Sequence, residues 1–458
     1  MSAALAGHSS VSARHRGQQR TWYPLDNSAK IFPAIKTGKV SAVFRLSIHL
    51  REVVDPAVLQ QALIDILPRF PHFAMKLKPG LFWYYLEPNP AGPLVYEDTR
   101  NPCRRLYRKD NQGFLFRVVY YERRIALEVF HSLADGTGSM AFLETLAARY
   151  LTLRYNLAIP CSDSILDIHQ PPAEEELEDS YRRYARPIHA FSRRRPRAYH
   201  LDGKLEAMGR INVISARIPV QALHDLAARY GATINDLLVA SYIHAYCRLQ
   251  QAGENRPHRP VVIAVPVNMR RFYASRTLRN FFLRVHPQIN QVYGSFTFTE
   301  IINEVHHSMK IMTLEKYLNA QMYANVRAEK MLGARLVPLL LKNQILRLAY
   351  LFFGDSRTTS TLTNVGAVHL PEIMQTYVEG FDAMMGPSLA NWVNCAIISY
   401  QGNLVMTFTR RIREPLVERL VLTHLVQLGI PVQVSSNQDA GPVRGKSGAN
   451  RDSVTQET

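Results

Sequence analysis

The chain has 458 residues, 47% of them hydrophobic, and a formal net charge of +18. This length and apolar content are sufficient for one large or two medium-sized α/β domains. The positive charge is compatible with a polyanionic ligand or an anionic membrane surface, while most of it is expected to form an ordinary solvated surface. No helix-turn-helix, zinc-finger or RNA-recognition pattern accompanies the charge, so we expect no nucleic-acid partner.

The two ends of the chain differ from its middle. Residues 1–20 are rich in Ser, Ala, Gly and Arg without an apolar period, and residues 436–458 are again polar, so both are expected to be disordered. No apolar signal region follows the N-terminal charges, and the four cysteines are scattered without a Cys-x-x-Cys pair. These features predict a cytoplasmic location, no zinc or other metal site and no disulfide framework.

The first half begins with a strand, a helix and several further strands. Apolar residues alternate from Val40 to Leu50, which predicts a half-buried strand. Asp55 followed by Pro56 predicts the start of a helix that runs to about Leu67. This order predicts an α/β sandwich, and no glycine-rich phosphate loop occurs in it. The further strands are expected at residues 81–86, 94–96, 114–121 and 124–129.

His131 follows the last of these strands and precedes a helix-patterned run over residues 140–153. Because imidazole exchanges a proton near neutral pH, His131 is a candidate general base for a hydroxyl, amine or thiol. Asp135 is expected either to orient the imidazole or to anchor the loop through an arginine. Gly136 and Gly138 are expected to relieve the steric limits of the turn. The spacing alone fits equally a buried histidine followed by a helix cap.

A polar and basic stretch, residues 171–204, separates two halves of the chain. It begins with Pro171-Pro172 and ends after the basic run Arg193-Arg194-Arg195, and we interpret it as a crossover linker. The expected subdomains are therefore residues 21–170 and 205–435. Further basic pairs, at 104–105, 270–271 and 410–411, are candidates for steering a polyanionic ligand.

The second half again alternates strands with capped helices. Thr233 and Asp236 predict a capping box for a helix that runs to Leu249, and Thr297 with Glu300 predicts another that runs to about Met312. The remaining expected elements are strands at residues 211–218, 261–267, 359–366, 392–400 and 404–409 and a helix at residues 414–428.

Residues 324–353 form a very apolar helical region that Pro338 and several polar residues interrupt. It is therefore a poor candidate for a membrane span. Packing in the core or around an apolar tunnel for an acyl group or alcohol is the favoured interpretation. Peripheral contact with a membrane surface is the alternative.

The pattern His131-x-x-x-Asp135-Gly136 resembles the signature of the CoA-dependent acyltransferase and condensation-domain superfamily. The resemblance covers roughly residues 20–435 and implies two chloramphenicol-acetyltransferase-like α/β sandwich subdomains with the active-site channel between them. Condensation domains usually carry two adjacent histidines, whereas this chain has Phe130 before His131. That departure favours the free-standing branch that resembles alcohol acetyltransferases.

The resemblance also implies roles for other residues. Asn268-Met269-Arg270 resembles a segment whose arginine pairs with the motif aspartate, so Arg270 is expected to hold Asp135 in a structural role. Asn280 resembles an asparagine of the channel, although Arg279 stands where the family usually has glycine. Residues 359–366 resemble a segment at the reaction centre, where Thr361, Thr363 and Asn364 are candidates for binding substrate or an oxyanion.

Together these features predict an O-acyltransferase that moves an acyl group, expected to be acetyl, from CoA to an alcohol. His131 would deprotonate the acceptor for direct attack on the thioester. The partners would be acyl-CoA as co-substrate and a small alcohol, with no bound cofactor. One alternative is a condensation-type or polyketide-associated enzyme that uses a carrier protein and an amine or lipid alcohol. Others are a non-catalytic binding protein and a serine hydrolase using Ser132 or Ser139, although no Gly-x-Ser-x-Gly elbow is present.

Overall fold

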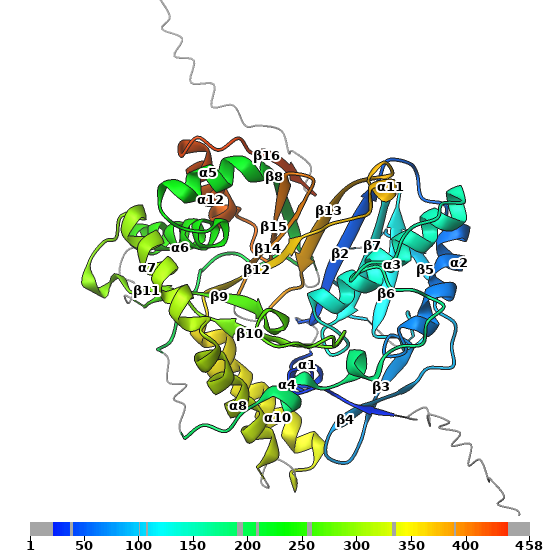
Figure 1. Ribbon diagram of the computed structural model, residues 1–458. Coiled ribbons are helices and arrows are strands. Elements are labelled where there is room, and N and C mark those ends of the chain that lie inside the picture. Colours follow the sequence, from blue (N-terminus) through cyan, green and yellow to red (C-terminus); the bar gives the residue numbers. More distant parts are fainter. Residues whose placement is uncertain are drawn as a thin grey trace, which may run out of the picture.

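The computed structural model describes most of the chain between residues 22 and 437. The described ranges are residues 22–36, 40–99, 101–106, 109–189, 196–207, 210–253, 259–331, 336–388 and 391–437. The expectations for residues 1–20, for nearly all of 436–458 and for Arg193-Arg194-Arg195 lie outside these residues. Within them the chain is a mixed α/β protein built around two large sheets (Figure 1), so the predicted fold class is confirmed.

A five-stranded sheet organises the first half of the chain. Its strand order is β13-β2-β7-β6-β5, and all neighbours are antiparallel except β5 and β6. Its strands are β2 (Val43–Leu50), β5 (Val95–Glu97), β6 (Phe116–Tyr121), β7 (Arg124–Phe130) and β13 (Val378–Met385). A separate small sheet has the order β1-β4-β3, from β1 (Tyr23–Pro24), β3 (Met75–Pro79) and β4 (Tyr84–Pro88).

An eight-stranded sheet organises the second half. Its order is β10-β9-β12-β14-β15-β8-β16, with β11 also paired to β9. Its strands are β8 (Asn212–Pro219), β9 (Val261–Asn268), β10 (Phe282–Val285), β11 (Gln288–Ile289), β12 (Ser360–Ala367), β14 (Val393–Tyr400), β15 (Asn403–Arg410) and β16 (Gln433–Ser436). Strand β12 runs parallel to both of its neighbours, β9 and β14, which places its residues in the middle of the sheet.

The sheets and their helices form two large clusters of buried apolar side chains. One large buried cluster includes side chains of the five-stranded sheet and of α2 (Pro56–Ile66) and α3 (Gly136–Tyr155). The other includes side chains of the eight-stranded sheet and its helices. Those helices are α5 (Val220–Arg229), α6 (Ile234–Ala252), α7 (Phe298–Met312) and α12 (Leu416–Gln427). Shorter helices are α1 (Ile31–Ile35), α4 (Ser180–Tyr184) and α11 (Glu372–Gln375).

The predicted helix starts are present with their caps. The Asp55 side chain accepts hydrogen bonds from the first backbone N–H groups of α2. Thr233 and Asp236 form the expected capping box of α6, and Thr297 and Glu300 form that of α7. Such caps satisfy backbone donors that have no partner within the helix, which is why these boundaries were readable from the sequence.

Strand β13 corrects the expectation that residues 205–435 form one subdomain. It lies in the five-stranded sheet, paired antiparallel with β2, so that Phe381 faces Ile48 across the strand pair. The buried Asp382 accepts a hydrogen bond from the Ser47 hydroxyl at 2.9 Å and contacts His49 at 2.6 Å. The chain therefore returns from the second half to complete the first sheet, and the two halves are interlocked.

The apolar region 324–353 also differs from its expected packing. It divides into the end of α8 (Glu315–Lys330), α10 (Leu339–Ala349) and a π-helical turn at Tyr350–Gly354. Most of its large apolar side chains are exposed. Helices α8 and α10 lie at the lower edge of the molecule in Figure 1. The expectation of core packing is therefore wrong for most of these side chains, because α10 lies at the rim, where only one face meets the protein. Among the described residues, no helix is long and apolar enough to cross a membrane.

Candidate active site

A cavity of about 1000 Å³ lies between the two halves and is lined by both. The first half contributes His131 and Thr137, and the second contributes Asn268 and Thr361. A cavity of this size is suited to a small-molecule substrate pair. The expected channel between two subdomains is therefore present, with His131 on its wall.

Aromatic rings hold His131 at the end of β7. Its backbone N–H donates to the Ala42 carbonyl at 2.9 Å. The imidazole stacks on Phe32, with ring centroids 4.5 Å apart and planes 8° from parallel. Phe44 and Phe282 approach it with centroids at 5.0 and 5.2 Å. Because these rings come from both halves of the chain, the orientation of the imidazole depends on how the halves meet.

Asn280 determines which nitrogen of His131 is available. The Asn280 Nδ2 group donates to the buried Asp26 carboxylate at 3.1 Å, so its Oδ1 atom is directed at His131. That oxygen lies 3.0 Å from His131 Nδ1. An amide oxygen accepts and cannot donate, so Nδ1 carries the proton and Nε2 is the unprotonated nitrogen. Asn280 is itself buried and is not on the cavity wall, a place that suits positioning of the imidazole better than contact with a substrate.

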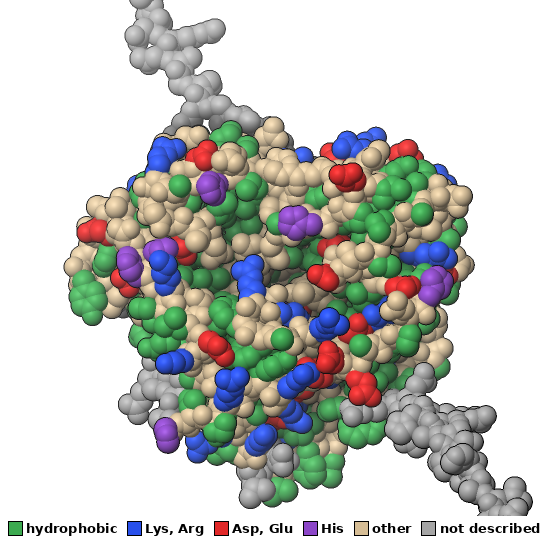
Figure 2. All heavy atoms as spheres, viewed as in Figure 1, with side chains coloured by type: hydrophobic (Ala, Val, Ile, Leu, Met, Phe, Trp, Pro, Cys, Tyr) green, Lys and Arg blue, Asp and Glu red, His purple; other side chains and the backbone are tan. Residues whose placement is uncertain are grey.

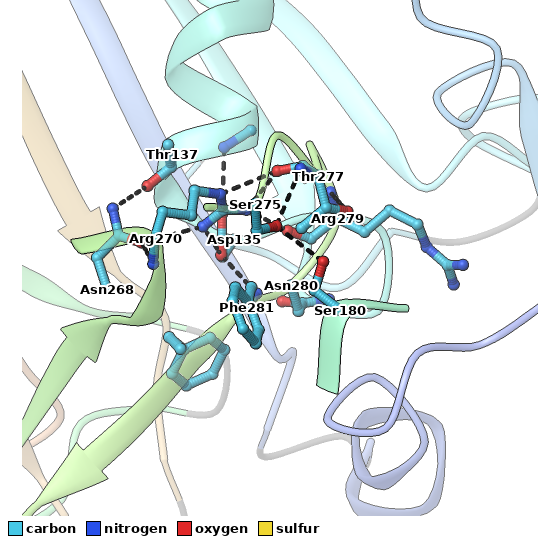
Figure 3. Close-up of polar contacts among 12 residues, drawn as sticks. Asp135, Thr137, Ser180, Asn268, Arg270, Ser275, Thr277, Arg279, Asn280 and Phe281 are labelled. Carbon is cyan, nitrogen blue, oxygen red and sulfur yellow. Dashed lines mark hydrogen bonds and ion pairs between the residues drawn. The ribbon is translucent and has the colours of Figure 1, made fainter. Parts of the chain in front are cut away.

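Arg279, which stands where the family pattern has glycine, has a structural role of its own. Its side chain is buried and extends away from Asp135, as Figure 3 shows. Its Nη2 donates to the Pro24 carbonyl at 2.7 Å, and its Nε lies 3.8 Å from the Asp26 carboxylate. Burial raises the pKa of Asp26, and the Arg279 guanidinium and the Asn280 amide oppose that rise. Arg279 and Asp26 thus form a buried pair behind the imidazole.

Asp135 anchors the loop and does not orient the imidazole. Its Oδ1 accepts from the Gly138 N–H at 3.1 Å at the start of α3. Its Oδ2 accepts from Arg270 Nη1 and from the Phe281 N–H, both at 2.8 Å. The expected contact with Arg270 is therefore present (Figure 3), and it joins the first half of the chain to the second.

All three guanidinium nitrogens of Arg270 donate hydrogen bonds. It donates to the backbone carbonyl of Thr277 from Nε and Nη2, and to that of Arg279 from Nη2 at 2.6 Å. Each of these acceptors lies in the segment that leads to Asn280. The Asp135–Arg270 pair therefore fixes the backbone that carries Asn280, which in turn contacts His131.

The two glycines after Asp135 have different roles. A Cβ atom on Gly138 would lie 1.8 Å from the Leu278 carbonyl oxygen, so this close approach requires glycine. A Cβ atom on Gly136 would meet nothing within 4 Å, and its backbone does not adopt a positive φ. The expected steric relief is therefore wrong for Gly136. This residue lies on the cavity wall, where the missing side chain leaves space.

Burial lowers the pKa of His131 to about 4, and the Arg284 guanidinium adds to this shift. The Asp135 carboxylate and the Asn280 hydrogen bond oppose it. Both main causes disfavour the imidazolium. The ring is therefore neutral at physiological pH and available to accept a proton.

The three other predicted residues lie on β12. Thr361, Thr363 and Asn364 all line the cavity. Thr361 is buried, whereas Asn364 is exposed and accepts a hydrogen bond from the Gly366 N–H at 3.0 Å. The structure thus brings these residues to the same cavity as His131, while their roles remain predictions.

Basic residues gather along another part of the cavity wall. Arg271, His306 and Lys310 line it near the start of α6, and His306 Nδ1 lies 2.9 Å from the Asp236 carboxylate. Not all basic pairs of the sequence serve such a surface. Arg410 is buried and paired with Glu418 at 2.6 Å, so its charge is structural.

Other chemistry receives little support from the described residues. The Ser132 hydroxyl is buried and donates to the Ala29 carbonyl at 3.0 Å, and the Ser139 hydroxyl is buried without a hydrogen-bond partner. Neither serine lines the cavity. No group of three or more His, Cys, Asp or Glu suited to a metal occurs in the part of the chain that the structure describes.

Asp26 is the residue at this site that sequence reasoning did not identify. It lies 105 residues before His131 and acts through Asn280, a residue of the other half. A solitary aspartate after Pro24-Leu25 carries no pattern that indicates a buried charge. The one signal in the sequence is Arg279, which stands where glycine was expected. If this arginine is buried, as it is here, a carboxylate is needed to compensate its charge.

No family model matches the sequence, and the comparison with curated proteins finds no match. Solved structures do match. Polyketide synthase associated protein 5 from Mycobacterium tuberculosis is 17% identical with a TM-score of 0.55, covering 88% of this chain and 97% of that one. TRI3 trichothecene 15-O-acetyltransferase from Fusarium sporotrichioides is 12% identical with a TM-score of 0.59, over 89% and 94%.

TRI101 from F. sporotrichioides, solved with coenzyme A and T-2, is 10% identical with a TM-score of 0.59, and the match covers 90% of this chain and 99% of that one. At such identities the likeness establishes the fold and not the activity. The chain therefore has the two-subdomain α/β fold shared by condensation domains and CoA-dependent acyltransferases.

Proposed function

We propose that this protein is an acyltransferase that moves an acyl group, acetyl in the simplest case, from CoA to the hydroxyl of an alcohol. The observation that carries the proposal is His131, a neutral imidazole on the wall of a cavity of about 1000 Å³ with Nδ1 held by Asn280. This arrangement leaves Nε2 as the proton acceptor. The fold, shared with proteins described as acetyltransferases, supports the same reaction.

The reaction proceeds without an acyl-enzyme. His131 Nε2 accepts the proton of the acceptor hydroxyl while its oxygen attacks the thioester carbonyl carbon. The carbonyl oxygen becomes an oxyanion, for which the Thr361 or Thr363 hydroxyl is the candidate donor. When the intermediate collapses, the C–S bond breaks, and the imidazolium returns its proton to the departing thiolate. The products are the ester and free CoA.

The basic part of the wall is suited to the donor. The side chains of Arg271 and Lys310 provide positive charge for the phosphates of CoA. A guanidinium and an ammonium of this kind raise the local concentration of a polyanion and help to hold it. The donor would then extend its thioester toward His131 from that side, and the acceptor would approach from the other.

Transfer from a carrier-protein thioester to an amine or lipid alcohol is the second candidate. It is favoured by the structural match with condensation domains, such as the first condensation domain of the CDA synthetase, 16% identical with a TM-score of 0.53. The two candidates differ in their donor. Only the first requires turnover of free acyl-CoA.

A free-thiol release assay tests the proposal. Acetyl-CoA and longer acyl-CoAs would be offered with alcohols and, separately, with amines. We expect acceptor-dependent thiol release with alcohols, and His131→Ala should reduce it by roughly 10²–10⁴-fold while the protein stays folded. His224, on the exposed side of α5, provides the matched control His224→Ala, which should retain full activity. Turnover that persists in folded His131→Ala would refute the general base. Turnover only with a carrier-bound donor would favour the second candidate.

A further inference from the structure

An apolar stripe runs along the outer face of α10 and continues into the turn that follows it. The stripe consists of Leu341, Ile345, Leu348 and Phe352, at spacings of four, three and four residues, which place them on one side of a helix. These side chains are 49–57% exposed. Leu340, beside the stripe, is 84% exposed. A contiguous row of this kind marks an interaction surface, unlike single exposed apolar residues.

The inner face of α10 is fixed to the protein, so the stripe cannot turn inward. The Leu339 N–H donates to the Leu81 carbonyl at 2.9 Å. The buried Lys342 ammonium donates to the Phe82 carbonyl at 2.7 Å and lies 3.8 Å from the Trp83 ring centroid. Asn343 adds a hydrogen bond to the Tyr84 hydroxyl at 3.0 Å. The β3–β4 hairpin thus holds the helix with its apolar stripe facing outward.

Two exposed cations lie close to the stripe in sequence. Between residues 330 and 354 the chain has no Asp or Glu. Lys330 at the end of α8 and Arg347 on α10 are both exposed. Figure 2 shows Lys and Arg side chains, with fewer Asp and Glu, over the lower part of the molecule, where Figure 1 places α8 and α10. An apolar helix face bordered by cations is the pattern of a helix that lies in the interface of an anionic bilayer.

The same helix reaches the cavity with its other side. Leu346 and Ala349 of α10, with Tyr350 and Gly354 of the following turn, line the cavity wall. The stripe and the cavity are therefore separated by a single helix. A surface that met this stripe would lie next to the wall formed by these residues.

We propose that the outer face of α10 docks on the surface of an anionic lipid bilayer. The apolar stripe enters the boundary between headgroups and acyl chains, and Lys330 and Arg347 meet the lipid phosphates. The net charge of +18 strengthens the attraction at long range. Docking does not depend on the proposed acyl transfer, so the two proposals can fail separately.

Vesicle sedimentation with the full chain tests this docking. The vesicles would be phosphatidylcholine alone, or phosphatidylcholine mixed with phosphatidylglycerol. We expect the protein to sediment with the mixed vesicles and to remain in solution with neutral ones. The double variant Leu341→Glu/Leu348→Glu should reduce the bound fraction roughly tenfold or more, because it places two charges in the stripe. Leu340→Glu, at a site too exposed to disturb packing, should weaken binding as well.

A matched control carries the same change of charge elsewhere. Ile64 on α2 and Val426 on α12 are 47% and 55% exposed, and both helices lie away from α10 in Figure 1. The variant Ile64→Glu/Val426→Glu should bind mixed vesicles as the wild type does. The proposal would be overturned if the wild type does not bind mixed vesicles, or if the stripe variants bind them as well as the wild type does. So would a wild-type dimer in size-exclusion chromatography that the stripe variants dissociate, because the stripe would then be an interface between copies.

Discussion

Asn280 Oδ1 lies 3.0 Å from His131 Nδ1, and the orientation of that amide is set by a carboxylate that touches neither the imidazole nor the cavity. Asp26 accepts from Asn280 Nδ2 and thereby directs the amide oxygen toward the histidine. Sequence-distant residues thus control which tautomer the candidate base adopts. The arrangement makes Asn280 a positioning residue for the proposed reaction.

Asn280→Ala should lower kcat about 10–100-fold with little change in KM, because the tautomer and ring orientation would no longer be fixed. It should also lower the melting temperature, because the buried Asp26 carboxylate loses a hydrogen-bond donor. The measurement is steady-state kinetics with acyl-CoA and an accepted alcohol, alongside thermal melting. Asn319 provides the matched control, since its amide joins α8 to the backbone of Arg186 away from the cavity. Asn319→Ala should leave kcat unchanged. A rise in KM alone for Asn280→Ala would instead indicate contact with substrate.

The pH profile should reveal the environment of His131. Its pKa is lowered to about 4, and only the neutral imidazole accepts a proton. The value of kcat/KM should therefore stay level as the pH falls from 7 to about 5 and decline with a midpoint near pH 4, rather than near the ordinary histidine value of about 6.5. Circular dichroism at each pH would separate this titration from acid unfolding. A midpoint between pH 6 and 7 in folded protein would show that the ring is more solvated than the structure indicates.

The order of most elements could be predicted because local rules determine it. Alternation of apolar residues predicted β2, and capping residues predicted the starts of α2, α6 and α7. The Asp135–Arg270 contact was also expected, because both residues belong to recognisable segments. These features depend on neighbours in sequence or on a motif.

Features set by tertiary partners could not be read in the same way. The β13 strand, Val378–Met385, joins a sheet whose other strands precede it by more than 240 residues, and nothing in its composition names that partner. The stripe on α10 has the apolar pattern of a core helix. Its exposure follows from its position at the rim, beside the β3–β4 hairpin. Asp26 was not identified for a similar reason: its role depends on its burial and on its contact with Asn280, and its sequence neighbours indicate neither.

Removing Asp135 should destabilise the protein more than removing His131. Asp135→Ala leaves the largely buried Arg270 guanidinium without its carboxylate partner, which should lower the free energy of unfolding by about 3–5 kcal/mol. His131→Ala removes only aromatic contacts and one hydrogen bond. Denaturant unfolding of both variants measures the difference. The double variant Asp135→Ala/Arg270→Ala should lose less stability than the sum of the single variants, because no unpaired charge remains. Equal stability of Asp135→Ala and His131→Ala would contradict the anchoring role of the pair.

The two glycines of the motif provide a matched comparison. Gly138→Ala should destabilise the fold by about 3 kcal/mol, because its methyl group would overlap the Leu278 carbonyl, a backbone group that cannot rotate away. Gly136→Ala makes the same chemical change two residues earlier, where nothing lies within 4 Å. It should be neutral or stabilise α3 by up to about 1 kcal/mol. Its methyl group would instead enter the cavity and raise KM for the bulkier substrate. Thermal melting separates the two variants, and a folded Gly138→Ala with wild-type stability would show that α3 and the Leu278 segment are not in the close contact seen here.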